Sequence, residues 1–386
     1  MKIFIDNAKI EEYLKNAVAP DKNELDEILL HARELKGISF KEAERLLLIS
    51  KEGDIDKLAE TANFIKESIY GKRLVLFAPL YISNMCNNEC LYCAFRRSNK
   101  LITRNTLTME QIAKETEALI DQGHKRILLV SGEGLGKKAL DYTIDALNTI
   151  YSVKKPKGNI RRINVNIAAL DVEDYKRLKE ANIGTYQLFQ ETYHEETYRK
   201  MHKSGPKSDY EYHLGAMDRA MEGGIDDIGI GILFGLTDYK YEIMALLQHI
   251  KHLENKFGVG PHTISVPRLE PATGSDIASN PPYPVADNDF RKIIAILRIT
   301  VPYTGIILST RENAEMRREA LHLGISQISA GSKSAPGGYT KKEHQNEQFS
   351  LGDHRSLHEV IEDIVDYDHI PSFCTGCYRL GRVGKD

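Results

Sequence analysis

Short apolar runs alternate with longer amphipathic stretches along most of this chain, beginning near residue 73. Continuous apolar runs that are each followed by a segment of helix length are typical of parallel strands covered by helices. Eight such runs occur, at residues 74–83, 126–132, 163–170, 184–191, 226–235, 262–271, 305–311 and 325–332. Eight repeats of strand and helix predict an α/β fold, the (β/α)8 TIM barrel.

The two ends of the chain follow other patterns. Residues 1–70 carry apolar positions at helical spacing and no convincing strand, so we expect a helical N-terminal extension there. The barrel is expected over 71–340, and a C-terminal helix followed by a tail over 341–386. Within the barrel, Thr108 and Gln111 form a capping-box pattern that starts one helix.

Polar residues gather where the predicted strands end, which is the end of a (β/α)8 barrel that carries the active site. They are a cysteine-rich loop after the first strand; Ser131, Gly132 and Glu133 after the second; Gln190 and Glu191 after the fourth; His262 and Arg268 in and beside the sixth; Ser309 and Arg311 after the seventh; and Ser329 and Ser332 after the eighth. Together they predict a pocket at this mouth of the barrel.

Three cysteines, Cys86, Cys90 and Cys93, stand in the run SNMCNNECLYCAF directly after the first predicted strand. This spacing puts three thiolates on one short loop, and a 4Fe-4S cluster held by three thiolates leaves one iron open to a substrate or cofactor. The alternative is a structural zinc ion, which needs a fourth ligand. That ligand would come from far along the chain, because the loop holds no histidine and the other cysteines are Cys374 and Cys377. We therefore expect an iron-sulfur cluster.

Charge and composition limit the binding partners and the cellular compartment that we expect. The net charge of −3 and the pI near 6.5 predict no bulk attraction to nucleic acid or to an anionic membrane. No run reaches the roughly 18 apolar residues of a membrane helix, and the N-terminal stretch lacks the apolar core of a secretory signal. Five cysteines in two tight groups fit metal binding in a reducing compartment. We expect an anaerobic, cytoplasmic protein.

An open-iron cluster at the rim of a barrel resembles the radical S-adenosylmethionine (SAM) superfamily, in which the cluster and SAM together generate a 5′-deoxyadenosyl radical. The resemblance implies a 4Fe-4S cluster, SAM as cofactor, and a barrel of the radical SAM type. The resemblance also implies which residues bind SAM. Phe95 would lie against the adenine, and Ser131, Gly132 and Glu133, which resemble the family's GGE motif, would hold the methionyl ammonium. Glu191 and His213 are the two later SAM-binding positions. Ser131 replaces the first glycine of that motif, and His213 stands where close relatives often have an arginine for the SAM carboxylate.

The resemblance extends over nearly the whole chain to a narrower family. The segments FAPLYISNMCNNECLYCAF, QETYHEETYRKMHKSGPKSDY, MDRAMEGGIDDIGIGILFGL, GVGPHTISVPR, ISAGS and IPSFCTGCYRLGR are similar to the radical SAM tyrosine lyases of iron-iron hydrogenase maturation, the HydG family of 2-iminoacetate synthase type.

That family cleaves the Cα–Cβ bond of L-tyrosine to p-cresol and dehydroglycine (2-iminoacetate) during maturation of the hydrogenase H-cluster. The resemblance implies that Arg311 binds the tyrosine carboxylate, which suits a guanidinium, and that Ser309, Ser329 and Ser332 add hydrogen bonds. It also implies an electron donor such as ferredoxin or flavodoxin, and contact with other hydrogenase maturases.

The family carries a second iron-sulfur cluster on a C-terminal tail, where carbon monoxide and cyanide are made on an added iron. By resemblance, His262 would bind that iron, and Cys374 and Cys377 would be two of the three cysteines of the second cluster. The third is missing before Asp386, so the chain is short at its C-terminus relative to the family, and the resemblance does not extend to carbon monoxide and cyanide synthesis.

Three other interpretations remain open at this point. A thiamine-pathway tyrosine lyase shares the barrel and the cleavage but ends without a cysteine tail, so Cys374 and Cys377 favour the hydrogenase maturase. A radical SAM enzyme for another amino acid would keep the cluster and change the pocket around Arg311. A non-catalytic iron-sulfur scaffold would bind metal but not SAM.

Overall fold

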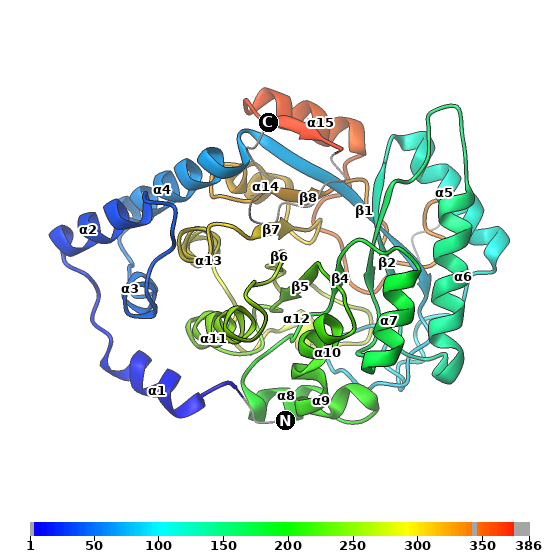
Figure 1. Cartoon of the computed structure of the whole chain (residues 1–386), viewed down its shortest axis with the longest axis horizontal. Helices are drawn as coiled ribbons and strands as arrows, with labels where there is room; N and C mark the ends of the chain where they lie inside the picture. The colour runs from blue at the N-terminus through cyan, green and yellow to red at the C-terminus, as the bar shows by residue number, and fades with distance from the viewer. Residues whose placement is uncertain (1–3, 342–345, 374–386) are drawn as a thin grey trace.

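The computed structural model describes residues 4–341 and 346–373, which form a closed parallel barrel with helices around it (Figure 1). Each of β1 to β7 pairs in parallel with the next strand along the chain, and β8 pairs with β1, which closes the barrel. The strands are β1 (Arg73–Ser83), β2 (Arg126–Ser131), β3 (Arg162–Asn166), β4 (Tyr186–Gln187), β5 (Ile228–Gly231), β6 (Thr263–Ser265), β7 (Gly305–Leu308) and β8 (Gln327–Ser329). The predicted (β/α)8 fold is confirmed.

Helices cover the outside of the barrel. They are α5 (Met109–Gln122), α6 (Ala139–Ser152), α7 (Val172–Glu180), α8 (Glu195–Met201), α9 (Tyr210–Leu214), α10 (Ala216–Glu222), α11 (Tyr239–Phe257), α12 (Asp276–Ser279), α13 (Asp287–Thr300) and α14 (Ala314–Ala320), with 3-10 turns η1 (Gly136–Lys138) and η2 (Pro206–Ser208). The predicted capping box is present, because the side chain of Thr108 accepts from the backbone of Gln111 at the start of α5. No helix in the described part of the chain is long and apolar enough to cross a membrane.

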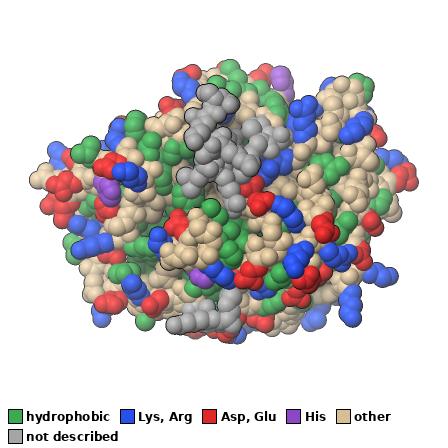
Figure 2. All heavy atoms as spheres, in the orientation of Figure 1, with side chains coloured by type: hydrophobic (Ala, Val, Ile, Leu, Met, Phe, Trp, Pro, Cys, Tyr) green, Lys and Arg blue, Asp and Glu red, His purple; other side chains and the backbone are tan. Residues whose placement is uncertain are grey.

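Four helices precede the barrel, α1 (Asn7–Asn16), α2 (Lys22–Ala32), α3 (Phe40–Leu46) and α4 (Glu52–Tyr70). They lie along one side of the barrel, outside α11 and α13 (Figure 1). The buried ammonium of Lys292 on α13 donates to the backbone oxygen of Ile49 over 2.9 Å, which ties the extension to the barrel wall. Acidic and basic side chains are interspersed over the face seen in Figure 2.

A ninth strand and a further helix follow the barrel. Helix α15 (Leu357–Asp366) leads into β9 (Ile370–Ser372), which pairs in parallel with the first residues of β1. The N–H of Ile370 donates to the backbone oxygen of Lys72 over 2.9 Å. The last described residues therefore lie where β1 begins, at the end of the barrel opposite to the strand C-termini.

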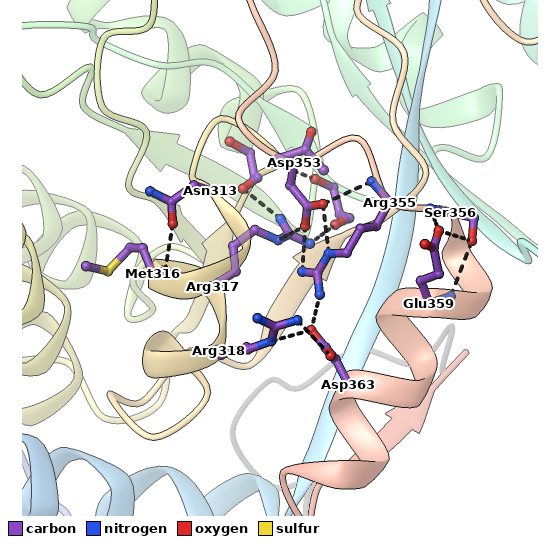
Figure 3. A network of polar contacts seen from close by, with 12 residues as sticks. Asn313, Met316, Arg317, Arg318, Asp353, Arg355, Ser356, Glu359 and Asp363 are labelled. Atoms are coloured by element: carbon purple, nitrogen blue, oxygen red, sulfur yellow. Dashed lines mark hydrogen bonds and ion pairs between the residues drawn. The ribbon is translucent and has the colours of Figure 1, made fainter.

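A buried arginine joins the ends of β7 and β8 to the segment that precedes α15 (Figure 3). Arg317, only 1% exposed, donates to the backbone oxygens of Ser309 over 2.8 Å and Ser329 over 2.6 Å. Its Nε lies 2.7 Å from an Asp353 carboxylate oxygen, and Asp353 also pairs with Arg355 at 2.7 Å. This arrangement fixes the ends of two strands that carry predicted site residues.

Replacing Arg317 by methionine should lower the free energy of unfolding by about 3 kcal/mol, because a buried carboxylate loses one of its two cationic partners. Arg318→Met is the matched control, since that side chain is 38% exposed and pairs with Asp363 nearer the surface. We expect it to cost less than about 1 kcal/mol. Urea unfolding of both variants measures the difference, and an equal loss would contradict the role assigned to Arg317.

Candidate active site

A cavity opens at the C-terminal ends of the barrel strands, where the sequence predicts it. Twelve of the predicted site residues line it: Cys86, Cys90, Cys93, Phe95, Ser131, Gly132, Glu133, Glu191, Ser309, Arg311, Ser329 and Ser332. Residues from β1, β2, β7 and β8 and from the loops after them thus meet in one space, although more than 200 positions separate the first from the last.

The cysteine loop after β1 is held close to the end of β2. A Cβ added to Gly132 would lie 2.4 Å from the backbone oxygen of Met85, and one added to Gly134 would lie 2.4 Å from its carbonyl carbon. Glycine is required at both positions because the two backbones touch. Arg104 also supports the loop, donating to the backbone oxygens of Asn84 and Phe95 over 2.7 Å each.

The three thiols of this loop face the same cavity. Burial raises the pKa of Cys86, raises that of Cys90 well above its usual range, and raises that of Cys93 to about 11. Without a metal these groups are therefore thiols at neutral pH, and binding of iron would release their protons. Three thiols on one wall fit a cluster whose fourth iron faces the cavity. Among residues 4–341 and 346–373, no three His, Cys, Asp or Glu side chains are grouped to hold a single metal ion.

Residues 201–207, which we call the strap, run alongside the cysteine loop. The N–H of Leu91 donates to the oxygen of Met201 over 2.9 Å, and Glu89 exchanges backbone hydrogen bonds with Lys203 and Ser204 over 3.0 and 2.9 Å. These bonds resemble a short antiparallel pairing, and they fix the cysteine loop from its outer side.

Charged groups form a network on the wall between the strap and the ends of β2 and β4. Asn88 donates to a Glu133 carboxylate oxygen over 2.6 Å and accepts from the N–H of Lys207 over 2.9 Å. The Lys207 ammonium lies 2.7 Å from a Glu191 carboxylate oxygen, and both side chains are about 90% buried. Burial alone would lower the pKa of Lys207, but Glu191, Cys90 and Glu133 raise it above its usual value. Glu191 has a φ of 68°, an uncommon conformation for glutamate that aims its side chain at this wall.

Two aromatic residues of the cysteine loop line the cavity. Phe95 was predicted from the sequence, and its ring meets Tyr81 edge-on at 6.0 Å between centroids. Tyr92 was missed, although an aromatic between Cys90 and Cys93 was a visible signal. Its hydroxyl lies 2.8 Å from Nε2 of His202 in the strap, which holds the ring in place.

Arg311 lies on the wall formed by the ends of β7 and β8. Its guanidinium carbon is 3.3 Å from the centroid of the Phe349 ring, and burial lowers its pKa, although an arginine stays charged at any physiological pH. Ser329 Oγ accepts from the N–H of Thr310 over 3.1 Å. Ser332 Oγ is buried without a hydrogen-bond partner among the described residues, so it is available to a ligand.

His213 and His262 do not line the cavity, and neither do Gln190 and Arg268 of the predicted pocket, so the roles that the resemblance implies for the two histidines stay predictions. His213 on α9 turns its Nε2 to the backbone oxygen of Phe189 at 2.9 Å, and burial lowers its pKa to about 3. His262 precedes β6, so it lies at the opposite end of the barrel, with its Nδ1 3.8 Å from Asp227. Cys374 and Cys377 lie outside the described residues.

Comparison with known proteins agrees with this geometry. The sequence model of the Radical SAM superfamily matches residues 80–250, and that of the Biotin and Thiamin Synthesis associated domain matches residues 265–370. The 2-iminoacetate synthase of Escherichia coli (strain K12) is 33% identical over 341 residues, which are 88% of each chain.

Two solved structures are also similar. One is a crystal structure of HydG, a maturase of the [FeFe]-hydrogenase, with 51% identity and a TM-score of 0.94 over 99% of this chain and 83% of that one. The other is HydG from Carboxydothermus hydrogenoformans, with 47% identity and a TM-score of 0.88 over 97% of this chain and 85% of that one.

Proposed function

This chain belongs to the radical SAM family of 2-iminoacetate synthases, and we propose that it is a tyrosine lyase that cleaves the Cα–Cβ bond of L-tyrosine in hydrogenase maturation. One observation carries the proposal: the cysteine loop and Arg311 open into the same cavity. A radical generated at the loop would therefore meet an amino acid held by Arg311 without crossing solvent. The family implies a 4Fe-4S cluster and SAM as cofactors.

One wall of the cavity would bind the cluster and SAM, and the opposite wall would bind the substrate. Cys86, Cys90 and Cys93 would hold the cluster, and the chemistry supplied by bound cluster and SAM is the reductive cleavage that yields a 5′-deoxyadenosyl radical. Glu133 and Glu191 offer carboxylates to the ammonium of SAM, while the rings of Phe95 and Tyr92 offer apolar surfaces to its adenine.

The opposite wall would orient tyrosine. The Arg311 guanidinium suits a bidentate contact with the substrate carboxylate, and Ser309, Ser329 and Ser332 offer hydroxyls beside it. Apolar residues of the barrel interior, including Phe77 and Ile307, line the same cavity and exclude water from the reacting bond. Loss of a hydrogen atom from the tyrosine amino group to the 5′-deoxyadenosyl radical would allow the Cα–Cβ bond to break into dehydroglycine and a 4-hydroxybenzyl radical. One electron from the external donor and one proton would then convert that radical to p-cresol.

The later steps and the partners are further parts of the proposal. An electron donor such as ferredoxin or flavodoxin would reduce the cluster, other hydrogenase maturases would receive the product, and the reaction would take place in the cytoplasm. Synthesis of carbon monoxide and cyanide is not part of the proposal. If a second iron-sulfur cluster forms, His262, Cys374 and Cys377 would be the residues involved, and of these only His262 lies among the described residues.

Product analysis tests the function directly. The protein is reconstituted anaerobically with iron and sulfide, reduced, and mixed with SAM and tyrosine. We expect 5′-deoxyadenosine and p-cresol, with glyoxylate as the hydrolysis product of dehydroglycine. Cyanide and carbon monoxide in the same assay would report the second step. Deoxyadenosine without p-cresol would contradict tyrosine as the substrate and favour another amino acid, and a loaded cluster that binds no SAM would favour a non-catalytic scaffold.

A further inference from the structure

The number of positively charged side chains in the cavity equals the number of carboxylates on its two proposed ligands, SAM and tyrosine. Its lining includes two positively charged residues, Lys207 and Arg311, and two acidic ones, Glu133 and Glu191. SAM and tyrosine each bring one carboxylate and one ammonium, which are costly to bury without opposite charges. Because the proposed function gives Arg311 to the carboxylate of tyrosine, one cation and one ligand carboxylate remain.

We propose that Lys207 binds the carboxylate of SAM. This inference rests on the proposed function, since it assumes that SAM enters this cavity. It assigns to a residue of the strap the role that the sequence resemblance gave to position 213. His213 faces the backbone oxygen of Phe189 and does not line the cavity, whereas Lys207 does.

The backbone fixes Lys207 beside the cysteine loop. The N–H of Lys207 donates to Asn88 Oδ1 over 2.9 Å, and Asn88 lies between Cys86 and Cys90. Gly205, two residues earlier, has a φ of 93°, and a Cβ there would lie 2.5 Å from the same Asn88 oxygen. The strap can approach this closely only with glycine at that position. The ammonium is therefore held on the cluster side of the cavity, where the methionyl end of SAM has to lie.

The ammonium has donors to spare. Lys207 carries three N–H groups, and one of them points to the Glu191 oxygen at 2.7 Å. A ligand carboxylate can thus be bound while the contact with Glu191 is kept, so neither residue has to be left as a lone buried charge. Glu133 is occupied on one oxygen by Asn88, and its other oxygen remains for the ligand ammonium.

The experiment compares two ligands on two variants. The ligands are SAM and its decarboxylated analogue, measured by equilibrium dialysis against the reconstituted, unreduced holoprotein. The variants are Lys207→Met and Lys203→Met. Lys203 is the matched control because it is exposed, belongs to the same strap, and contacts the cysteine loop through its backbone. Iron and sulfide content are measured for every variant.

We expect Lys207→Met to bind SAM about 10- to 100-fold more weakly, as for loss of a buried charged hydrogen bond. Its affinity for the decarboxylated analogue should change less than about 3-fold, because that ligand lacks the group that Lys207 contacts. Lys203→Met should match the wild type with both ligands. Equal losses with the two ligands, or an unchanged affinity for SAM, would overturn the inference.

Two further results keep the test decisive. If Lys207→Met does not retain the cluster, Lys207→Gln is measured instead, because glutamine still donates to Glu191 without carrying a charge; the same dependence on the ligand carboxylate is expected. If the wild-type holoprotein itself binds no SAM, the proposed function fails, and that outcome is distinct from failure of the role of Lys207.

Discussion

Replacing Cys90 by serine is expected to abolish formation of both 5′-deoxyadenosine and p-cresol, a loss on the order of 1000-fold or more, because a cluster held by three thiolates cannot spare one. Cys90 is 6% exposed and is anchored by the backbone bridge to His202, so neither solvent nor another cysteine of the described chain can replace it. The measurements are the visible absorbance and iron content after anaerobic reconstitution, followed by product analysis.

Asn87→Ala is the matched control for this substitution. Asn87 belongs to the same loop and is exposed, and its N–H donates to the backbone oxygen of Glu133 at 3.2 Å, a contact that alanine keeps. We expect this variant to retain the cluster and both products. A serine variant that kept full absorbance and activity would exclude Cys90 as a cluster ligand.

The second large effect is expected at Arg311. Replacement by methionine removes the only guanidinium that lines the described cavity and should cost about 2–4 kcal/mol of transition-state stabilisation, or about 30- to 1000-fold in kcat/KM for p-cresol formation. SAM should still bind, since the cysteine loop and Lys207 belong to the other wall. The variant should therefore lose p-cresol while its binding of SAM remains near that of the wild type.

Arg311→Lys separates charge from shape. Lysine keeps the positive charge but cannot make the two parallel hydrogen bonds of a guanidinium, so we expect an activity between the wild type and Arg311→Met. The measurements are p-cresol formation as a function of tyrosine concentration, and SAM binding by equilibrium dialysis. Loss of SAM binding in parallel with p-cresol would contradict the assignment of Arg311 to tyrosine.

The barrel could be predicted from the sequence because its periodicity is local. Each apolar run and the helix after it are read within about 30 residues, and the parallel order then follows from chain connectivity. The lengths of the strands are harder to predict from the sequence. The run at 184–191 contains a regular strand only at β4 (Tyr186–Gln187), because the chain turns into a left-handed conformation at Glu191 that no hydrophobic pattern predicts.

The site was predictable where its residues follow strands directly, and less so where loops return from elsewhere. Lys207 belongs to a loop after α8, and its place depends on a contact with Asn88 that is 119 positions away. His213 lies on the short helix α9, where a shift of one residue rotates a side chain by about 100° around the helix axis. Such a shift determines whether the side chain faces the cavity or the packed interior. β9 was missed because its three residues pair with β1 almost 300 positions earlier.

The pairing of β9 with the start of β1 determines how far the last described residues lie from the cysteine loop. Ile370 is opposite Arg73, and β1 then runs through eleven residues to Ser83 before the cysteine loop begins. At about 3.3 Å per residue, the last described residues and the cysteine loop stand about 30 Å apart, at opposite ends of one strand. A small molecule released beside the cysteine loop is therefore about one strand length away from the segment that pairs with the start of β1. A second reaction at that far end would require the molecule to cover this distance, and a trapping reagent in the medium would lower its yield if the molecule travels through solvent.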